Sequence, residues 1–417
     1  MDAEPPTNLS PVSPDGGGVG QRDLRLIYAV QALRALVYGF GSILIGAELA
    51  AAGYSDARVG FVVTSMLAGF AVMSVAVGTR GDRIGRRRLY AALLLLMAAA
   101  GSVFALTHWL PALILAALTG TISTDANESG PITSLEQAMI PQAAPGIAAR
   151  TKAFARYNAI AYLLGSVGAL AAGGPDFFRR FIPALPASER FLLAFPVIGL
   201  ACAVLASRLS ARVEAGRELT ASRRFPLVRS KKAVAGLAGL FAADSFGGGF
   251  VVQTFLVFWF KTKFGASTEV MGLVFFAAGL LQAASSVASG WLGNRIGLLN
   301  TMVFTHLPSN VLLVVVPFMP SLGPAIAVLL ARFAISQMDV PARQAYVVSM
   351  VDPDERTAAA SYTNTARYLV RPGGSALGGY LTGLWLAAPF VAAGSVKILY
   401  DLVLLGTFRR VRLTGDR

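Results

Sequence analysis

Long apolar stretches alternate with short polar turns along almost the whole chain. Each apolar stretch holds about 20 residues or more, which is the length that an α-helix needs to cross the hydrocarbon core of a bilayer. The pattern predicts six spans in each half of the chain, near residues 26–51, 57–78, 88–107, 110–140, 150–174 and 189–208, and then 233–262, 268–291, 299–319, 322–350, 357–386 and 389–408. We therefore expect an all-α integral membrane protein with twelve transmembrane helices.

The composition agrees with a membrane protein and excludes several other classes. Hydrophobic residues make up 55% of the chain and charged residues only 14%, whereas soluble domains contain about 25% charged residues. A net charge of +14 would suggest nucleic-acid binding in a soluble chain, but here the basic residues cluster in loops, which is a topology signal. Cys202 is the only cysteine, so an intrachain disulfide and a cysteine-based metal site are excluded. We expect no metal, no cofactor and no nucleic-acid partner.

Basic loops divide the chain and orient it. Residues 1–22, rich in Pro, Gly and Ser, are predicted to be a disordered tail. The predicted domains then follow as 23–207 (first six-helix bundle), 208–232 (basic linker), 233–408 (second six-helix bundle) and 409–417 (basic tail). Because short loops rich in Lys and Arg stay in the cytoplasm, we expect a multi-pass inner (plasma) membrane protein with both termini cytoplasmic. Arg179, Arg180 and Arg190 fall on the other side and count against this orientation.

A basic turn between the second and third spans occurs twice. GTRGDRIG at 78–85 is followed by GWLGNRIG at 290–297, and this offset of 212 residues, near half the chain, indicates an internal duplication. The repeat argues against an ordinary basic loop. The first copy resembles the signature G-x-L-A-D-R-x-G-R-[RK] of the major facilitator superfamily (MFS). The matching residues are Gly78, Asp82, Arg83, Gly85, Arg86 and Arg87. The departures are Arg80, where the family usually has Leu, and Asn294 in place of the acid in the second copy.

This resemblance implies two six-helix repeats and a secondary transporter that works by alternating access. It also implies a role for the turn itself, because in the family the acid of this turn interacts with the neighbouring half at the cytoplasmic face. Asp82 and Arg86 are therefore expected to form a conformational latch that helps to hold that face closed.

The duplication also locates an irregularity in the first half. Glu136 matches Arg343 at an offset of 207, so about five extra residues lie between the basic turn and the inner part of the fourth span. The polar stretch 123–131 is one place for them, and the loop around His108 accounts for the spacing equally well. A continuous helix over 110–140 would be about 45 Å long, and Pro341 interrupts the tenth span. Interrupted helices at matching positions of two halves indicate a substrate site between them.

Ionisable residues inside spans are candidates for a substrate or proton pathway, because such charges are costly and normally face a cavity. The candidates are Arg34, Asp125, Glu128, Asp244, Arg332, Asp339, Arg367 and Arg371. The resemblance implies that the first, fourth, seventh and tenth spans line the cavity. Others have a structural interpretation: Lys397 with Asp401 as a pair on the last helix, Glu136 and Arg156 at the inner surface, and His306 as a structural residue.

Asp125 and Asp244 have no opposite charge close by in sequence, so we expect one of them to carry protons. Several permanent cations favour an anionic group in the substrate, with Arg371 as its best ligand, although pairing of these arginines with the acids is an equal alternative. Arg34 has a further interpretation, in which its side chain reaches the inner surface.

We thus predict a secondary active transporter that moves a small organic solute by alternating access, coupled to protons, with efflux preferred. The alternatives are uptake or exchange of an anionic metabolite and, in another class, a membrane receptor or assembly factor that does not transport. No ATP-binding loop is present and no enzyme is expected. The expected partners are a small-molecule substrate, protons and the lipid bilayer, and the chain is expected to be a monomer.

Overall fold

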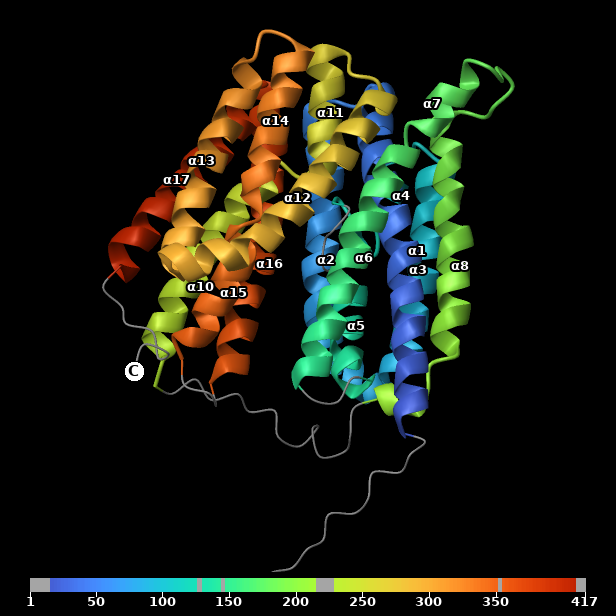
Figure 1. Ribbon diagram of the computed structural model, residues 1–417. Coiled ribbons are helices and arrows are strands. Elements are labelled where there is room, and N and C mark those ends of the chain that lie inside the picture. The colour runs from blue at the N-terminus through green and yellow to red at the C-terminus, as the bar shows by residue number, and fades with distance from the viewer. Residues whose placement is uncertain (1–15, 126–129, 144–146, 215–228, 352–354, 410–417) are drawn as a thin grey trace, which may run out of the picture.

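The computed structural model describes residues 16–125, 130–143, 147–214, 229–351 and 355–409, and these ranges contain helices and no strand (Figure 1). The helices of the first half are α1 (Gly16–Ala51), α2 (Asp56–Ile84), α3 (Arg86–Leu106), α4 (Leu110–Leu118), α5 (Pro131–Ala143), α6 (Ile147–Ala171), α7 (Gly174–Arg179) and α8 (Ala194–Ser207). The second half contains α10 (Lys231–Gly249), α11 (Gln253–Phe264), α12 (Thr268–Ile296), α13 (Leu298–Val315), α14 (Leu322–Ser336), α15 (Asp339–Ser349), α16 (Arg356–Leu384) and α17 (Ala388–Phe408).

These helices form the twelve segments that the hydrophobic pattern predicts. Three segments are pairs of helices that continue one another, namely α4 with α5, α10 with α11 and α14 with α15. By length and hydropathy, nine segments of the described chain qualify as membrane spans. The other three are the fourth, which is broken, and the fifth (α6) and eleventh (α16), which contain several polar residues. The predicted all-α fold with two six-helix halves is confirmed.

The two ends of the described chain lie at the same end of the molecule. Helix α1 begins there and α17 ends there, while α7 lies at the opposite end (Figure 1). Following the predicted orientation, we call the first the inner end and the second the outer end. Helix α1 begins at Gly16, so residues 16–22, which were predicted to belong to a disordered tail, are helical. Residues 1–15 of that predicted tail lie outside the described residues.

The fourth span is broken, and its break contains the insertion. Helix α4 ends at Leu118 and α5 begins at Pro131, whereas α14 and α15 are separated only by Gln337 and Met338. Helix α4 starts at residue 110 and α14 at residue 322. Their offset of 212 is the same as that between the two copies of the basic turn. The offset therefore changes inside the fourth span, and the alternative of an insertion around His108 is wrong. A third break, over residues 250–252 between α10 and α11, was not predicted.

Glycines bring the two halves into backbone contact toward the outer end. A Cβ added to Gly379 of α16 would lie 2.5 Å from the Cα of Gly60 in α2, and one added to Gly272 of α12 would lie 2.6 Å from the carbonyl oxygen of Ala169 in α6. Small residues allow helices in membranes to approach this closely. The ribbons of the halves approach each other toward the outer end and diverge toward the inner end (Figure 1). The conformation is therefore closed at the outer end.

We expect Gly379→Ala to open the outer end, because the added methyl group forces α2 and α16 apart. The reporter is Ser42→Cys in a Cys202→Ala background, since Ser42 is fully buried on α1. Reaction with a membrane-impermeant maleimide applied at the outer face should become several-fold faster. The matched control is Gly383→Ala on the same helix, where an added Cβ meets no atom within 4 Å. Equal labelling rates in the two variants would contradict a role for this contact in closure.

Candidate functional site

The first charged cluster lies wholly within the first half. Arg34 of α1 donates from Nη2 to Oε2 of Glu136 in α5 at 2.5 Å and to the hydroxyl of Tyr157 in α6 at 3.1 Å. Glu136 also accepts from the hydroxyl of Tyr90 in α3 at 2.6 Å. Arg34 is 2% exposed and Glu136 is fully buried. Both side chains are therefore enclosed by protein, and Arg34 is bound to Glu136 instead of being exposed at the inner surface.

The second charged cluster lies within the second half and is centred on Asp244 of α10. Lys397 of α17 donates to Oδ1 of Asp244 at 2.6 Å, and Nη1 of Arg343 lies 3.4 Å from Oδ2. The same Arg343 nitrogen donates to Asp339 at 3.1 Å within α15. Asp244 is only 3% exposed. It therefore has several cationic partners, which sequence spacing did not reveal because they come from other helices.

His306 of α13 extends this second cluster. Its Nδ1 lies 2.9 Å from Oδ1 of Asp401 in α17, and its Nε2 lies 3.5 Å from Oδ1 of Asp244. Asn310 donates to the other oxygen of Asp401 at 3.0 Å. The predicted pairing of Lys397 with Asp401 is thus wrong: Lys397 is bound to Asp244 and Asp401 to His306.

The two clusters contain equivalent ion pairs of opposite polarity. In the first half the cation is on the first span and the acid on the fourth (Arg34 and Glu136), whereas in the second half the acid is on the seventh span and the cation on the tenth (Asp244 and Arg343). The residues are offset by 210 and 207, as the duplication requires. Each pair ties the first span of its half to the inner part of its interrupted fourth span.

A third group of contacts crosses between the halves, where two broken helices meet. Asp125, which follows α4, accepts from the backbone N–H of Gln253 at 2.7 Å and from Nη2 of Arg371 in α16 at 2.7 Å. The carbonyl of Thr124 accepts from both the backbone N–H and the hydroxyl of Thr254, at 3.0 and 2.9 Å. Gln253 is the first residue of α11, so the Asp125 carboxylate binds the positive end of that helix. Asp125 and Arg371 remain 25% and 22% exposed.

Arg332 and Arg367 differ from these paired groups. Neither makes an ion pair within the described residues, and the Nε of each is buried without a hydrogen-bond partner there. Arg332 of α14 lies within electrostatic range of Asp125, Asp244 and Asp339. Arg367 of α16 lies within range of Asp244 and Asp339 and also of the like charge of Arg343. Glu128, the remaining predicted pathway residue, lies outside the described residues.

The basic turn contacts α5 of its own half and the first residues of the linker. Gly85 separates α2 from α3 with φ of +96°, a conformation that glycine adopts readily and other residues avoid. Nη1 of Arg86 donates to the carbonyl of Ala138 at 2.8 Å, and the backbone N–H groups of Arg86 and Arg87 donate to Glu214. The side chains of Asp82 and Arg83 lie outside the described residues, as does the surrounding of Gly78. The latch stays a prediction.

The arginines of the outer end make a contact that sequence analysis missed. Arg180 pairs with Glu269 of α12 at 2.6 Å, which joins the two halves at an exposed position. Beside it, burial tends to raise the pKa of Asp176, but hydrogen bonds from Ser188 and from Thr268 of α12, together with Arg179, outweigh burial and leave that pKa below its usual value. Because its pKa is lowered, the Asp176 carboxylate stays ionised at lower pH than an ordinary aspartate does. The pair of Asp176 with Arg179 therefore keeps its negative partner down to a lower pH than an ordinary aspartate would.

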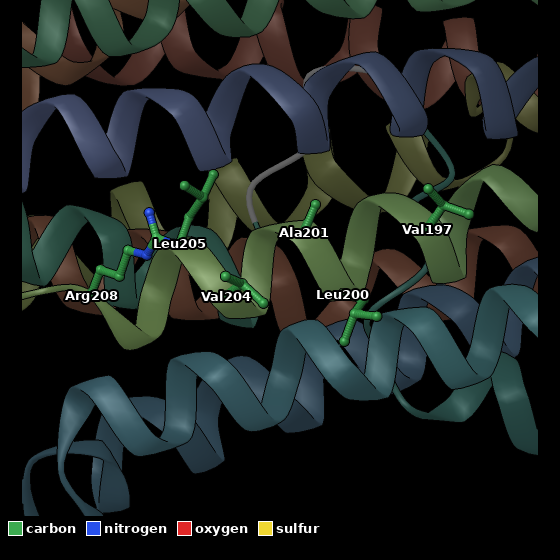
Figure 2. A pocket seen from close by; sticks show the side chains of 6 residues that line it. All are labelled: Val197, Leu200, Ala201, Val204, Leu205 and Arg208. Atoms are coloured by element: carbon green, nitrogen blue, oxygen red, sulfur yellow. The ribbon is translucent and has the colours of Figure 1, made fainter.

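An apolar groove follows the surface of α8, apart from the charged clusters (Figure 2). Five of the residues that line it are aliphatic and the sixth is charged: Val197, Leu200, Ala201, Val204, Leu205 and Arg208. The apolar surface of a membrane-spanning helix is suited to contact with lipid chains. The groove therefore places the apolar side of the sixth span on the outside of the bundle.

The fold has two six-helix halves, interrupted helices in each half and charged groups where these helices meet. This is the fold of a transporter of small solutes. The profile of the Major Facilitator Superfamily matches residues 27–375, which is most of the chain. The protein belongs to this family, as the basic turn indicated.

Similar proteins and structures agree with the fold. A Saccharomyces cerevisiae protein described as uncharacterized membrane protein YJR124C is 26% identical, over 93% of this chain and 94% of that one. A variant of the nucleoside transporter NupG matches with a TM-score of 0.68 and 12% identity, over 93% of this chain and 99% of that one. The D-xylose-proton symporter matches with a TM-score of 0.67 and 17% identity, over 94% and 99%. At these identities the structural matches establish the fold alone.

We expect Glu136→Gln to destabilise the protein strongly, because it leaves the charge of Arg34 buried without a counter-ion. Breaking a buried ion pair in this way costs about 3–5 kcal/mol. Replacing both Arg34 and Glu136 with Met should recover much of that loss. The measurement is thermal unfolding in detergent, with Asp176→Asn as the control, since its pair with Arg179 is about one-third exposed and worth about 0–1 kcal/mol. Equal effects of Glu136→Gln and the control would contradict the structural importance of the buried pair.

Proposed function

We propose that this protein is a secondary transporter that moves a small organic solute by alternating access. One observation carries the proposal: Asp125 binds both Arg371 and the N-terminus of α11 where two interrupted helices meet. Non-helical backbone at membrane depth is tolerated only inside protein or beside a watery cavity. A polar contact between two otherwise separate halves at that depth is suited to being broken and remade when the halves move.

We further propose that the solute contains an anionic group, bound by Arg332 and Arg367. The sequence favoured Arg371 as the ligand of the anionic group. That side chain is bound to Asp125, so for Arg371 the alternative prediction, pairing with an acid of the protein, applies. Arg332 and Arg367 have no acid partner among the described residues. Arginine keeps its charge at any physiological pH and binds carboxylate or phosphate with two parallel hydrogen bonds. An anion is therefore the natural partner for these two side chains.

The test begins with a thermal-shift screen of the purified protein against carboxylates, phosphates, amines and neutral solutes, because a bound ligand stabilises the folded state. Hits are then followed as flux in proteoliposomes, with a proton gradient of either direction. We expect anionic hits, and flux that responds to the gradient. The sign of that response also decides between the preferred efflux and the alternative of uptake. Exclusively cationic or neutral hits would contradict the anion proposal.

Arg332→Gln and Arg367→Gln should each weaken binding of the anionic hit about tenfold or more, the loss expected for a charge-assisted hydrogen bond. The matched control is Arg295→Gln, which removes an exposed cation of α12 that stacks on Trp291. Isothermal titration of all three variants makes the comparison. Unchanged affinity in both test variants would mean that these arginines have structural partners, for which Glu128 is the candidate.

The alternative from another class is a receptor or assembly factor that uses the same fold without transport. This alternative would be favoured if a ligand binds in the screen but no flux is seen with a proton gradient of either direction. Cooperative thermal unfolding of the same sample shows that the protein is folded.

The latch gives a separate prediction. Asp82→Asn should leave insertion and thermal unfolding unchanged but slow the flux severely, because the acid of the basic turn is expected to hold the inner end closed during each cycle. The control is Asn294→Ala at the equivalent position of the second copy, where no acid is present. A flux equal to wild type in Asp82→Asn would remove the latch from the mechanism.

A further inference from the structure

The groove on α8 has the length of one membrane leaflet and ends in a cation. Val197 and Arg208 are 11 residues apart, which is about 16 Å along a helix, and half of a bilayer core is about 15 Å thick. The aliphatic side chains of Val197, Leu200 and Val204 are exposed. Arg208 is the C-cap of α8 and lies at one end of the row (Figure 2). That end of α8 is at the inner end of the molecule (Figure 1).

A second arginine reaches the same end of α8 from α3, the helix that packs along it. Nη2 of Arg87 donates to the carbonyl of Ser207 at 3.2 Å, and Ser207 is the residue directly before Arg208. Arg88, the next residue of α3, is exposed. Arginine stays charged at any physiological pH. Permanent positive charge is therefore concentrated where the apolar groove ends.

Two acids lie close to this end of α8, and both bind other groups. Asp23 of α1 accepts from the backbone N–H of Ser210 at 2.9 Å and from its hydroxyl at 2.5 Å. Glu214 accepts from backbone N–H groups at the start of α3. Neither Arg87 nor Arg208 makes an ion pair within the described residues. Neighbouring like charges repel, and a phosphate group bound by both guanidinium groups removes that repulsion.

The internal duplication shows that this charge is not a general feature of the fold. In the second half α17 packs against α13 as α8 packs against α3, and α17 also has an arginine, Arg409, as its C-cap. At the offset of the basic turn, however, residues 86–88 correspond to Leu298, Leu299 and Asn300. These positions of α13 contain no cation. The second half therefore provides a matched control with one arginine in place of a cluster.

We infer that the α8 groove binds an anionic phospholipid of the leaflet at the inner end, with one acyl chain along α8 and the headgroup phosphate at Arg87 and Arg208. Basic pockets between membrane-spanning helices are suited to anionic headgroups. A zwitterionic lipid brings its own cation close to the arginines, and a free phosphate makes no use of the apolar groove. The site is separate from the solute pathway and does not depend on the proposed transport.

The test is native mass spectrometry of the full-length protein, titrated in detergent with dioleoylphosphatidylglycerol or with dioleoylphosphatidylcholine, which has the same chains. We expect one molecule of the anionic lipid to bind several-fold more tightly than the zwitterionic one. Arg208→Gln and Arg87→Gln should each weaken binding of the anionic lipid roughly fivefold, the contribution of one arginine near an anionic membrane surface. The matched control, Arg409→Gln, should leave that affinity unchanged. Thermal unfolding shows that each variant is folded.

Ala201→Trp tests the groove itself, because the indole fills it and leaves every charge in place. Binding of the anionic lipid should fall several-fold, whereas Leu399→Trp on the exposed face of α17 should have no effect. Equal binding of the two lipids, or unchanged affinity in folded Arg208→Gln protein, overturns the site. Displacement of the lipid by an equal concentration of glycerol phosphate means that the phosphate alone is recognised, which also overturns it. A dimer mass that Ala201→Trp abolishes makes the groove an interface between two copies and excludes the lipid.

Discussion

The cost of charge in a hydrocarbon environment is the constraint on which this structure depends. A buried ion must meet a counter-ion or hydrogen-bond partners, and here the partners come from different helices. The Arg34 and Glu136 cluster joins α1, α3, α5 and α6, and the Asp244 cluster joins α10, α13, α15 and α17. Since van der Waals packing is the main other force between helices in lipid, these clusters define each half as a unit.

Contacts between the halves are of a different kind. The Arg180 and Glu269 pair is exposed, and the Asp125 and Arg371 pair is about one-quarter exposed. Breaking an exposed pair such as Arg180 with Glu269 costs about 0–1 kcal/mol, against about 3–5 kcal/mol for losing one partner of a buried pair. Glycine contacts such as Gly60 with Gly379 involve no side chain that must rearrange on separation. Buried ion clusters inside each half, with an exposed ion pair and small-residue packing between the halves, favour movement of each half as a rigid body, which is what alternating access requires.

The sequence predicted the helices, the duplication and the break before Pro131, because span length and repeat offset are properties of the chain itself. It did not predict the break at residues 250–252, where no proline interrupts the apolar run. It also failed for charge partners. Asp244 has no opposite charge near it in sequence and yet contacts Lys397 from another helix, while Lys397 and Asp401, four residues apart, do not pair. Spacing along one helix reports only local neighbours, whereas partners across helices depend on packing that one sequence does not specify.

The reversed polarity of the two equivalent ion pairs shows that the charged groups of the two halves have diverged. An ion pair can be inverted only by changing both residues, since a single change leaves two like charges buried together. The first half keeps one acid and one base in its cluster, closed by tyrosine hydroxyls. In the second half, the acid on the seventh span is reached by Lys397 and His306 as well as by Arg343. The ionisable side chains of the described clusters are therefore more numerous in the second half, while Asp125 of the first half pairs with Arg371 across the interface.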